Sequence, residues 1–440
     1  MCVPPGVCAC KSPWRGYDCS EPHREGSSSH HDGFVYVYSP PDGLGLAAMR
    51  RSHLDPLYSS EVVFTDRLMS DYSLRTLDPN RALLFYVPTW LLPTYPNMVY
   101  DKGVHHHRNL VAALEEKDAV FQAAWRTNRS RHLFFTPGDK GACLWPRGPI
   151  YLTHWGLTTP WKAQMLPHMW RTDELVSARA NEPPCADERD VILPPVIEEK
   201  KIMKLTARRN NGTAAAADDS PLPASQWTCE LFFAGAARAE QKAAKSSWCD
   251  DGARGGVKCY SQGVRAAVFE HHQNRSGFCL APRLPSELYE RSRFCLAPSG
   301  EGFGDRLATS LLAGCVPLII QPAVRQPYDE LLPYDRFALR VGADRVPQLH
   351  ELLAAITPTE HAAMRAAARH YARAFDWVRP AGQAYAMARY SLCMRSLRPD
   401  GCEALRPNFL HQAASSPSRP MDLGDYNVGR VDATLARVPG

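Results

Sequence analysis

One segment constrains the fold of this chain more than any other, the run FCLAPSGEGFGDRLATSLLAGCVPLII at residues 294–320. An apolar stretch enters a turn that carries Gly300, Gly302 and Gly304, and a short apolar-faced segment then ends at Gly314. Backbone without Cβ can pass close to a ligand, and the first amides of a helix point outward, so a glycine-rich turn that enters a helix is a natural phosphate cradle. The segment predicts an anion site between a strand and a helix.

The rest of the chain supports a layered α/β protein. Runs rich in β-branched and aromatic residues predict strands, and residues 109–126 and 263–271 have the spacing of helices. The predicted strands are 34–38, 82–87, 132–136, 150–153, 190–193, 230–234 and 337–341. Thr357, followed by Pro358 and by Glu360 three residues after it, predicts a capped helix start.

Length and charge limit the classes of function. A chain of 440 residues exceeds the size at which one hydrophobic core stops growing, so two domains are expected. The formal net charge is +5 and no block of five basic residues occurs, which argues against nucleic acid as a partner. The best apolar run, residues 82–93, is shorter than the ~18 residues of a membrane helix. We expect contact with a membrane only through a segment outside this sequence.

The cysteines indicate an oxidising compartment. Cys2, Cys8, Cys10 and Cys19 lie in a C-x5-C-x-C-x8-C run that resembles the C-terminal part of an EGF-like module, which predicts disulfides. A zinc site, whose ligand spacing differs, and incidental thiols are the alternatives. Sequons at Asn128, Asn211 and Asn274 agree with a secreted or lumenal protein. A full module needs two earlier cysteines, so the natural chain is expected to start upstream.

Composition divides the chain into six parts. They are an EGF-like fragment (1–20), a linker (21–33), an N-terminal domain (34–207), a polar connector (208–225), a C-terminal domain (226–412) and a flexible tail (413–440). Three consecutive histidines, at 105–107, do not share one helix face and are expected in a solvated loop.

The glycine turn and several other motifs resemble those of the exostosin-like glycosyltransferases, glycosyltransferase family 47. The matching pieces, in that family's order, are GDKGAC (138–143), THWG (153–156), DVILPP (190–195), LFFAG (231–235), YSQGVR (260–265), the glycine-turn run (294–320) and QPYDELLPYDRFALRV (326–341). The resemblance implies a GT-B type α/β architecture, in which two Rossmann-like domains face a cleft. It also implies that the C-terminal domain holds a nucleotide sugar and that transfer inverts the anomeric carbon.

The resemblance assigns the donor site. Arg265 and Arg306 match the family's motif arginines and are expected to bind the diphosphate, with Gly300, Gly302 and Gly304 as its backbone cradle. The alternative is that the glycines form a tight turn and Arg306 pairs with a surface carboxylate. Asp329 matches an acidic position that accepts from ribose hydroxyls, or else it caps a helix. The family's acid three residues after Arg306 is Thr309 here, which is a departure that bears on donor contacts.

Inversion also needs a base on the acceptor side. Asp139, His154 and Asp190 match N-terminal motifs, and Asp139 ranks first because it follows a strand and stands near glycine. No D-x-D motif occurs, so no metal site and no cofactor are expected, and arginine and the helix dipole meet the charge of the leaving group. Five further cysteines are expected to be disulfides or buried thiols, namely Cys143, Cys185, Cys279, Cys295 and Cys315.

These features predict an inverting transferase that moves a sugar from a UDP donor to a polysaccharide or glycoprotein glycan, on the lumenal side of the Golgi. Its partners are then a nucleotide sugar and a glycan acceptor. The alternative is a non-catalytic extracellular carbohydrate-binding or adhesion protein that keeps the fold. A cytosolic zinc protein is a third alternative, which fourteen reduced cysteines would favour.

Overall fold

The computed structural model describes residues 33–40, 55–91, 100–143, 145–159, 184–205, 227–237, 260–300, 302–396 and 399–411. It also describes four two-residue strands that pair antiparallel, β1 (Cys2–Val3) with β2 (Val7–Cys8) and β3 (Trp14–Arg15) with β4 (Glu21–Pro22). Several predictions lie outside what the structure describes: the EGF-like module with its disulfides, of which Cys10 and Cys19 are undescribed and Cys2 and Cys8 appear only as strand residues, the connector 208–225, Asn211 and the tail 413–440.

The first domain is built on a six-stranded parallel sheet with the order β11-β9-β8-β7-β5-β6. Its strands are β5 (Val35–Val37), β6 (Arg75–Thr76), β7 (Leu84–Val87), β8 (His132–Thr136), β9 (Ile150–Thr153) and β11 (Val191–Ile192). Every residue of β7, β8 and β9 is buried, as in a parallel sheet whose two faces are both covered. Helices α1 (Ser60–Ser70), α3 (Tyr100–Lys117) and α4 (Ala119–Thr127) accompany it. The single helix predicted for 109–126 is two, because the Asp118 side chain caps a new helix.

The second domain has a five-stranded parallel sheet with the order β13-β12-β14-β15-β17. Its strands are β12 (Cys229–Ala234), β13 (Phe278–Ala281), β14 (Ser292–Pro298), β15 (Val316–Ile320) and β17 (Leu339–Arg340). Its helices are α8 (Val264–His272), α9 (Arg306–Leu312), α10 (Tyr334–Phe337), α11 (Leu349–Ala354) and α12 (Pro358–Tyr371). The capping box predicted at Thr357 and Glu360 is confirmed at the start of α12.

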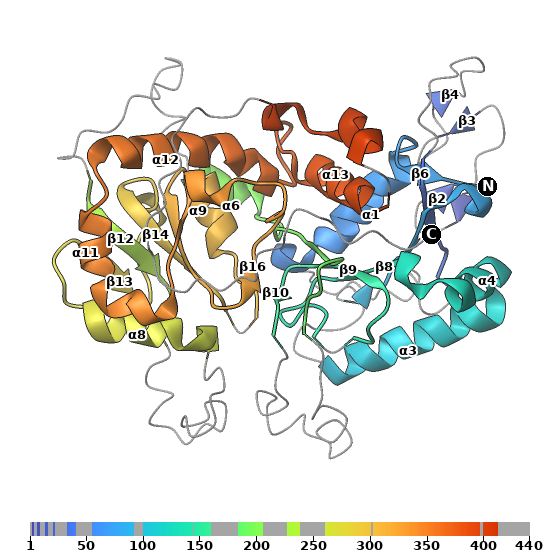
Figure 1. Cartoon of the computed structure of the whole chain (residues 1–440), viewed down its shortest axis with the longest axis horizontal. Coiled ribbons are helices and arrows are strands. Elements are labelled where there is room, and N and C mark those ends of the chain that lie inside the picture. The colour runs from blue at the N-terminus through green and yellow to red at the C-terminus, as the bar shows by residue number, and fades with distance from the viewer. Residues whose placement is uncertain are drawn as a thin grey trace.

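The two domains form two lobes that exchange helices (Figure 1). Helix α6 (Glu199–Leu205) precedes the connector but packs against the second domain, where Leu205 belongs to the same buried cluster as Phe232 and Cys295. Helix α13 (Ala384–Ser396) returns to the first domain, where the Tyr385 hydroxyl donates to Asp71 over 3.0 Å. The α/β class with two domains, each built on a parallel sheet, is confirmed.

A short antiparallel ladder joins the lobes. Strand β10 (Gly156–Leu157) of the first domain pairs with β16 (Val324–Arg325) of the second. A Cβ at Gly156 would stand 2.3 Å from the carbonyl oxygen of Arg325, so only glycine permits this pairing. The glycine of the THWG motif therefore serves the contact between the domains.

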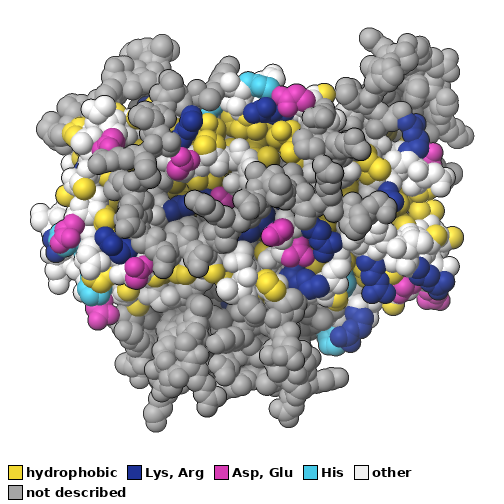
Figure 2. Space-filling model, in the orientation of Figure 1, with side chains coloured by type: hydrophobic (Ala, Val, Ile, Leu, Met, Phe, Trp, Pro, Cys, Tyr) yellow, Lys and Arg dark blue, Asp and Glu magenta, His cyan; other side chains and the backbone are white. Residues whose placement is uncertain are grey.

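Four disulfides confirm the expectation for the internal cysteines and add partners to it. They are Cys143–Cys185, Cys229–Cys279, Cys295–Cys315 and Cys393–Cys402. The prediction of a solvated loop for the three histidines is wrong. They lie on α3, where His106 and His107 are buried and the His107 ring packs at 4.5 Å from that of Trp145. On the face in Figure 2, described charges of both signs are interspersed.

Candidate active site

Two arginines converge at the end of strand β12. Arg265 is the second residue of α8 and Arg306 is the first residue of α9. Their guanidinium carbons lie 5.1 Å and 5.9 Å from the centre of the Phe233 ring. Because Phe233 stands near the carboxyl end of its strand, both cations lie at the edge of the parallel sheet where α/β proteins bind ligands.

Two segments carry these arginines and are hydrogen-bonded to each other. The amide of Ser261 donates to the carbonyl of Gly300 over 2.9 Å, and Arg265 Nη2 donates to the carbonyl of Ser299 over 2.9 Å. Ser261, Gln262 and Gly263 all have left-handed backbone, with φ of 60°, 54° and 77°. Two consecutive non-glycine residues in this region are strained, and such strain gathers at ligand sites.

Buried polar atoms without a protein partner mark this site. Among the described residues, the Ser261 hydroxyl, the Ser299 hydroxyl and Arg306 Nε make no hydrogen bond, although both serines are 1% exposed. Buried polar groups in proteins are nearly always paired, so three unpaired donors on two joined segments call for a ligand. A phosphate supplies only acceptors and suits all three. Neither serine had been singled out from the sequence, because hydroxyls carry no motif of their own.

The charge at this site is positive. The Asp305 carboxylate stands 2.5 Å from Lys201 Nζ and 3.7 Å from Arg306 Nη1. Burial by itself would raise the pKa of Asp305, but the cations of Arg306 and Lys201 lower it below its usual value. With Arg265 also acting on it, one carboxylate faces three cations, which leaves an excess of positive charge for an anion. Sequence reasoning missed Lys201 because it lies in α6, about a hundred residues away in the chain.

Contacts within the protein are enough to explain why glycine occupies these positions of the turn. A Cβ at Gly300 would meet the carbonyl of Phe303 at 2.8 Å, and one at Gly304 would meet that of Pro298 at 3.0 Å. One at Gly302 would meet the carbonyl of Asp139, in the other domain, at 1.6 Å. These contacts agree with the tight-turn alternative. Helix α9 has seven residues, so the arginines supply the positive charge of this site.

Asp329 and Thr309, the two other residues considered for the donor site, are in contact with groups of the protein itself. Arg340 forms an ion pair with Asp329 Oδ1, and the amide of Gln326 donates to its Oδ2 over 3.2 Å. No contact among the described residues joins Asp329 to Arg265 or Arg306. Thr309 is fully buried, and its hydroxyl lies 3.4 Å from Asp305 Oδ2. A carboxylate therefore stands beside position 309 although the residue itself is not acidic.

Asp139 lies in the first domain at the carboxyl edge of its sheet, three residues after β8. Its side chain is half-buried, and the Tyr58 hydroxyl donates to its Oδ1 over 2.9 Å. The backbone amide of Phe303, in the glycine turn of the second domain, donates to the Asp139 carbonyl over 3.1 Å. Asp139 is thus a carboxylate at the junction of the two domains.

His154 is a buried, fully bonded histidine. Its Nδ1 lies 2.7 Å from the carbonyl of Leu193, to which it donates, so its Nε2 accepts from the Ser60 hydroxyl at 2.5 Å. Burial lowers the pKa of His154 to about 4. The Phe303 ring lies 4.9 Å from its own. His154 therefore lies near Asp139 but has neither nitrogen available to an acceptor sugar.

Asp190 lies at the other edge of the sheet, directly before β11. It is fully buried and accepts from the amides of Tyr151 and Asp187 and from Arg147. Burial raises the pKa of Asp190 to about 6. Because His154 follows its strand and Asp190 precedes its own, the structure does not bring the three predicted base candidates together.

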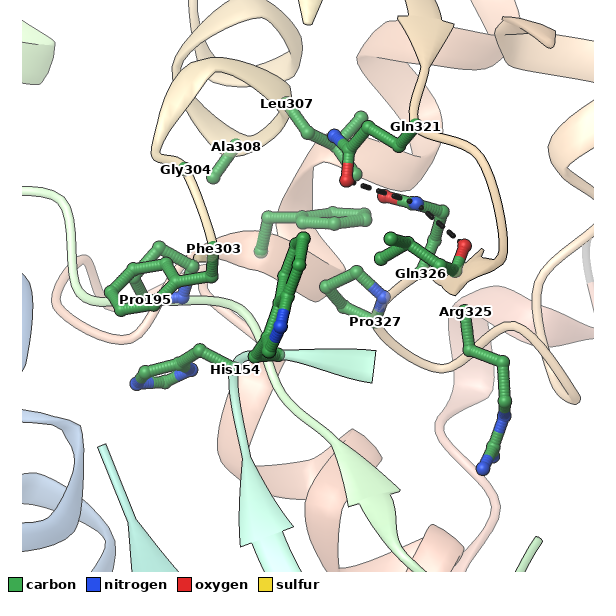
Figure 3. A pocket seen from close by; sticks show the side chains of 13 residues that line it. His154, Pro195, Phe303, Gly304, Leu307, Ala308, Gln321, Arg325, Gln326 and Pro327 are labelled. Atoms are coloured by element: carbon green, nitrogen blue, oxygen red, sulfur yellow. Dashed lines mark hydrogen bonds between the residues drawn. The ribbon is translucent and has the colours of Figure 1, made fainter. Parts of the chain in front are cut away.

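A small cavity lies between the lobes beside the glycine turn (Figure 3). His154, Phe303, Gly304, Leu307 and Gln326 are among the residues that line it, and the Arg325 side chain points away from it. Its volume of about 20 Å³ holds about one water molecule rather than a nucleotide. The contact between the domains is therefore closely packed here.

Comparison with known proteins identifies the family. The sequence model of the Exostosin GT47 domain matches residues 29–356, which is most of the chain. The chain belongs to the exostosin GT47 family. It is 24% identical over 336 residues to the probable beta-1,4-xylosyltransferase IRX10 of Arabidopsis thaliana, and this match covers 74% of this chain and 71% of that protein. It is also 24% identical over 328 residues to a probable glucuronosyltransferase of Oryza sativa subsp. japonica, covering 73% and 69%.

Solved structures resemble this GT47 chain more distantly. Anabaena HepE in complex with UDP-glucose is 12% identical, with 81% of this chain and 98% of that chain covered, but the TM-score of 0.31 is too low to carry an argument. Within the described residues, no helix has the length and apolar character of a membrane span. The same residues contain no group of three or more His, Cys, Asp or Glu side chains arranged for a metal ion.

Proposed function

We propose that this GT47 protein transfers a sugar from a UDP donor to a glycan acceptor with inversion at the anomeric carbon. The observation that carries the proposal is the convergence of Arg265 and Arg306 on the Phe233 ring, beside the unpaired hydroxyls of Ser261 and Ser299. Two guanidinium groups and two hydroxyls suit a diphosphate, whose negative charge grows as it leaves. The relatives named as xylosyl- and glucuronosyltransferases make UDP-xylose and UDP-glucuronate the first donors to examine.

Asp139 is the proposed base. In the reaction, the acceptor hydroxyl forms a bond to the anomeric carbon while the bond from that carbon to the diphosphate oxygen breaks. Asp139 takes the proton of the hydroxyl, and UDP leaves with the electron pair. Asp139 is preferred over His154 and Asp190 because it is half-buried at the domain junction, whereas both others are buried with their polar atoms bonded. Asp190 is proposed as a structural carboxylate and Asp329 as a residue that holds its loop.

The disulfides support the proposed compartment. Four of them lie within the described residues, and disulfides persist in secretory compartments and outside the cell. We therefore place the activity in the Golgi lumen, where nucleotide sugars meet growing glycans. Polysaccharide of the cell wall is the proposed acceptor, in keeping with the relatives.

The test is a matched pair of arginine variants. Arg306→Ala removes a charged hydrogen-bond donor worth about 1.5 to 3 kcal/mol, so turnover of the UDP-sugar falls by about one to two decades. Arg283→Ala, an exposed arginine in the same domain, is the control and leaves turnover unchanged. Thermal unfolding of both variants checks that they fold. Equal turnover in Arg306→Ala and wild type contradicts the donor site, and UDP binding without transfer to any acceptor favours the non-catalytic alternative.

A further inference from the structure

The glycine turn of the donor-binding domain touches Asp139 directly. The Phe303 amide donates to the Asp139 carbonyl over 3.1 Å, across the junction of the domains. A Cβ at Gly302 would stand 1.6 Å from the same oxygen, which no real side chain tolerates. Residue 302 must therefore be glycine for the domains to reach this distance. Gly300 and Gly304 differ, since their Cβ positions meet only their own turn.

Tyr58 contacts the side chain of Asp139. Its hydroxyl donates to Asp139 Oδ1 over 2.9 Å, and its ring meets the Phe303 ring edge-on with 5.8 Å between centroids. Tyr58 ends a one-turn helix, Pro56–Tyr58, that the Asp55 side chain caps. Asp139 is thus fixed through its side chain by Tyr58 and through its backbone by Phe303.

We propose that Tyr58, Gly302 and Phe303 are positioning residues that hold Asp139 in its reactive orientation at the junction of the two domains. This inference rests on the proposed function, which makes Asp139 the base. The contacts join the base to the turn that adjoins the donor arginines. The close packing of the turn against Asp139 therefore helps to set the position of the base relative to the bound donor.

Two variants of the full chain test the inference, with the donor affinity measured separately from turnover. Tyr58→Phe removes the hydroxyl that donates to Asp139 and keeps the ring, so kcat falls by about tenfold. The dissociation constant of UDP stays within about twofold, so the loss appears in kcat alone. Tyr72→Phe is the control, because the Tyr72 ring lies beside Arg75 and away from Asp139. This control leaves both kcat and the dissociation constant of UDP unchanged.

Gly302→Ala keeps the arginines but prevents the close approach, so kcat falls by about a hundredfold while the dissociation constant of UDP, measured by calorimetry, stays within about twofold. Loss of UDP affinity in parallel with kcat overturns the inference, because Gly302 then belongs to the diphosphate cradle, and the proposed function stands. An unchanged kcat in Tyr58→Phe overturns the inference as well. A wild-type protein that binds no UDP and transfers no sugar overturns the proposed function and this inference together.

Discussion

Asp190 is a residue whose hydrogen bonds all stabilise the fold. Its carboxylate joins the amides of Tyr151 and Asp187 to the Arg147 guanidinium, and its own carbonyl accepts from Arg395 of α13 over 3.0 Å. The resemblance to a family motif singled it out from the sequence, but a motif does not say at which edge of the sheet a residue stands. The direction of the chain decides this, because Asp190 precedes its strand.

Asp190→Asn is expected to destabilise the protein without altering donor binding. The Asn side chain offers one acceptor oxygen in place of two, so the buried amides and the half-buried Arg147 guanidinium are left incompletely paired, which costs about 1 to 3 kcal/mol in the free energy of unfolding. Asp187→Asn is the control, since that neighbouring acid is one-third exposed and its loss changes stability little. Chemical denaturation measures both variants, and the affinity for UDP of the folded Asp190→Asn protein is measured alongside. An Asp190→Asn protein as stable as wild type contradicts the structural role.

The backbone conformation of Ser261 and Gln262 could not be predicted from the sequence. The YSQGVR motif pointed to Arg265, and the structure places that arginine at the site. The left-handed backbone at Ser261 and Gln262 leaves no trace in the sequence, because such residues are neither glycine nor asparagine. The unpaired Ser261 hydroxyl became visible only when the fold brought this segment against the glycine turn.

At the scale of elements, the strands were the most predictable part. Apolar runs that end at proline or glycine gave β7, β8, β9, β12 and β14, because strands buried on both faces are apolar throughout. The start of α12 was predicted because a capping box is a local interaction. The break between α3 and α4 was missed, since both helices continue one apolar face on either side of Asp118.

The exchange of α6 and α13 between the lobes could not be predicted. Each helix follows its own domain in the sequence, and its amphipathic pattern shows that a face is buried but not which surface covers it. The contacts that decide it are long-range, such as Lys201 with Asp305 and Arg389 with Asp71. Helix α6 makes its contact beside the donor arginines, since Asp305 directly precedes Arg306, whereas α13 reaches the other lobe through Arg389 (Figure 1).

At the scale of the whole molecule, buried histidines determine how stability depends on pH. Burial lowers the pKa of His107 to about 3 and those of His132, His154 and His361 to about 4. The unfolded chain binds these four protons below about pH 6.5 whereas the folded chain does not, so stability is lost as pH falls toward about 4. Glu61 and Asp190 oppose this, since burial raises their pKa values to about 7 and about 6 and their contribution grows as pH falls.

The four histidines outweigh the two carboxylates. The midpoint temperature of thermal unfolding is therefore expected to fall steadily as the pH is lowered from about 6.5 to about 4.5. His107→Phe removes one of these four histidines, and the new ring fills the same space between Phe134 and Trp145. The slope of the unfolding free energy against pH therefore falls by about 1.4 kcal/mol per pH unit. Differential scanning calorimetry of both proteins across this range measures the effect. A midpoint that rises on acidification in wild type contradicts this balance between the histidines and the two carboxylates.

In the proposed function, the C-terminal domain binds the diphosphate of the donor between Arg265 and Arg306. A crystal structure of the full chain with UDP tests it most directly. We predict phosphate oxygens within hydrogen-bond distance of both guanidinium groups and of the Ser261 or Ser299 hydroxyl. A nucleotide bound in the N-terminal domain, or one whose phosphates lie away from these two arginines, contradicts the claim.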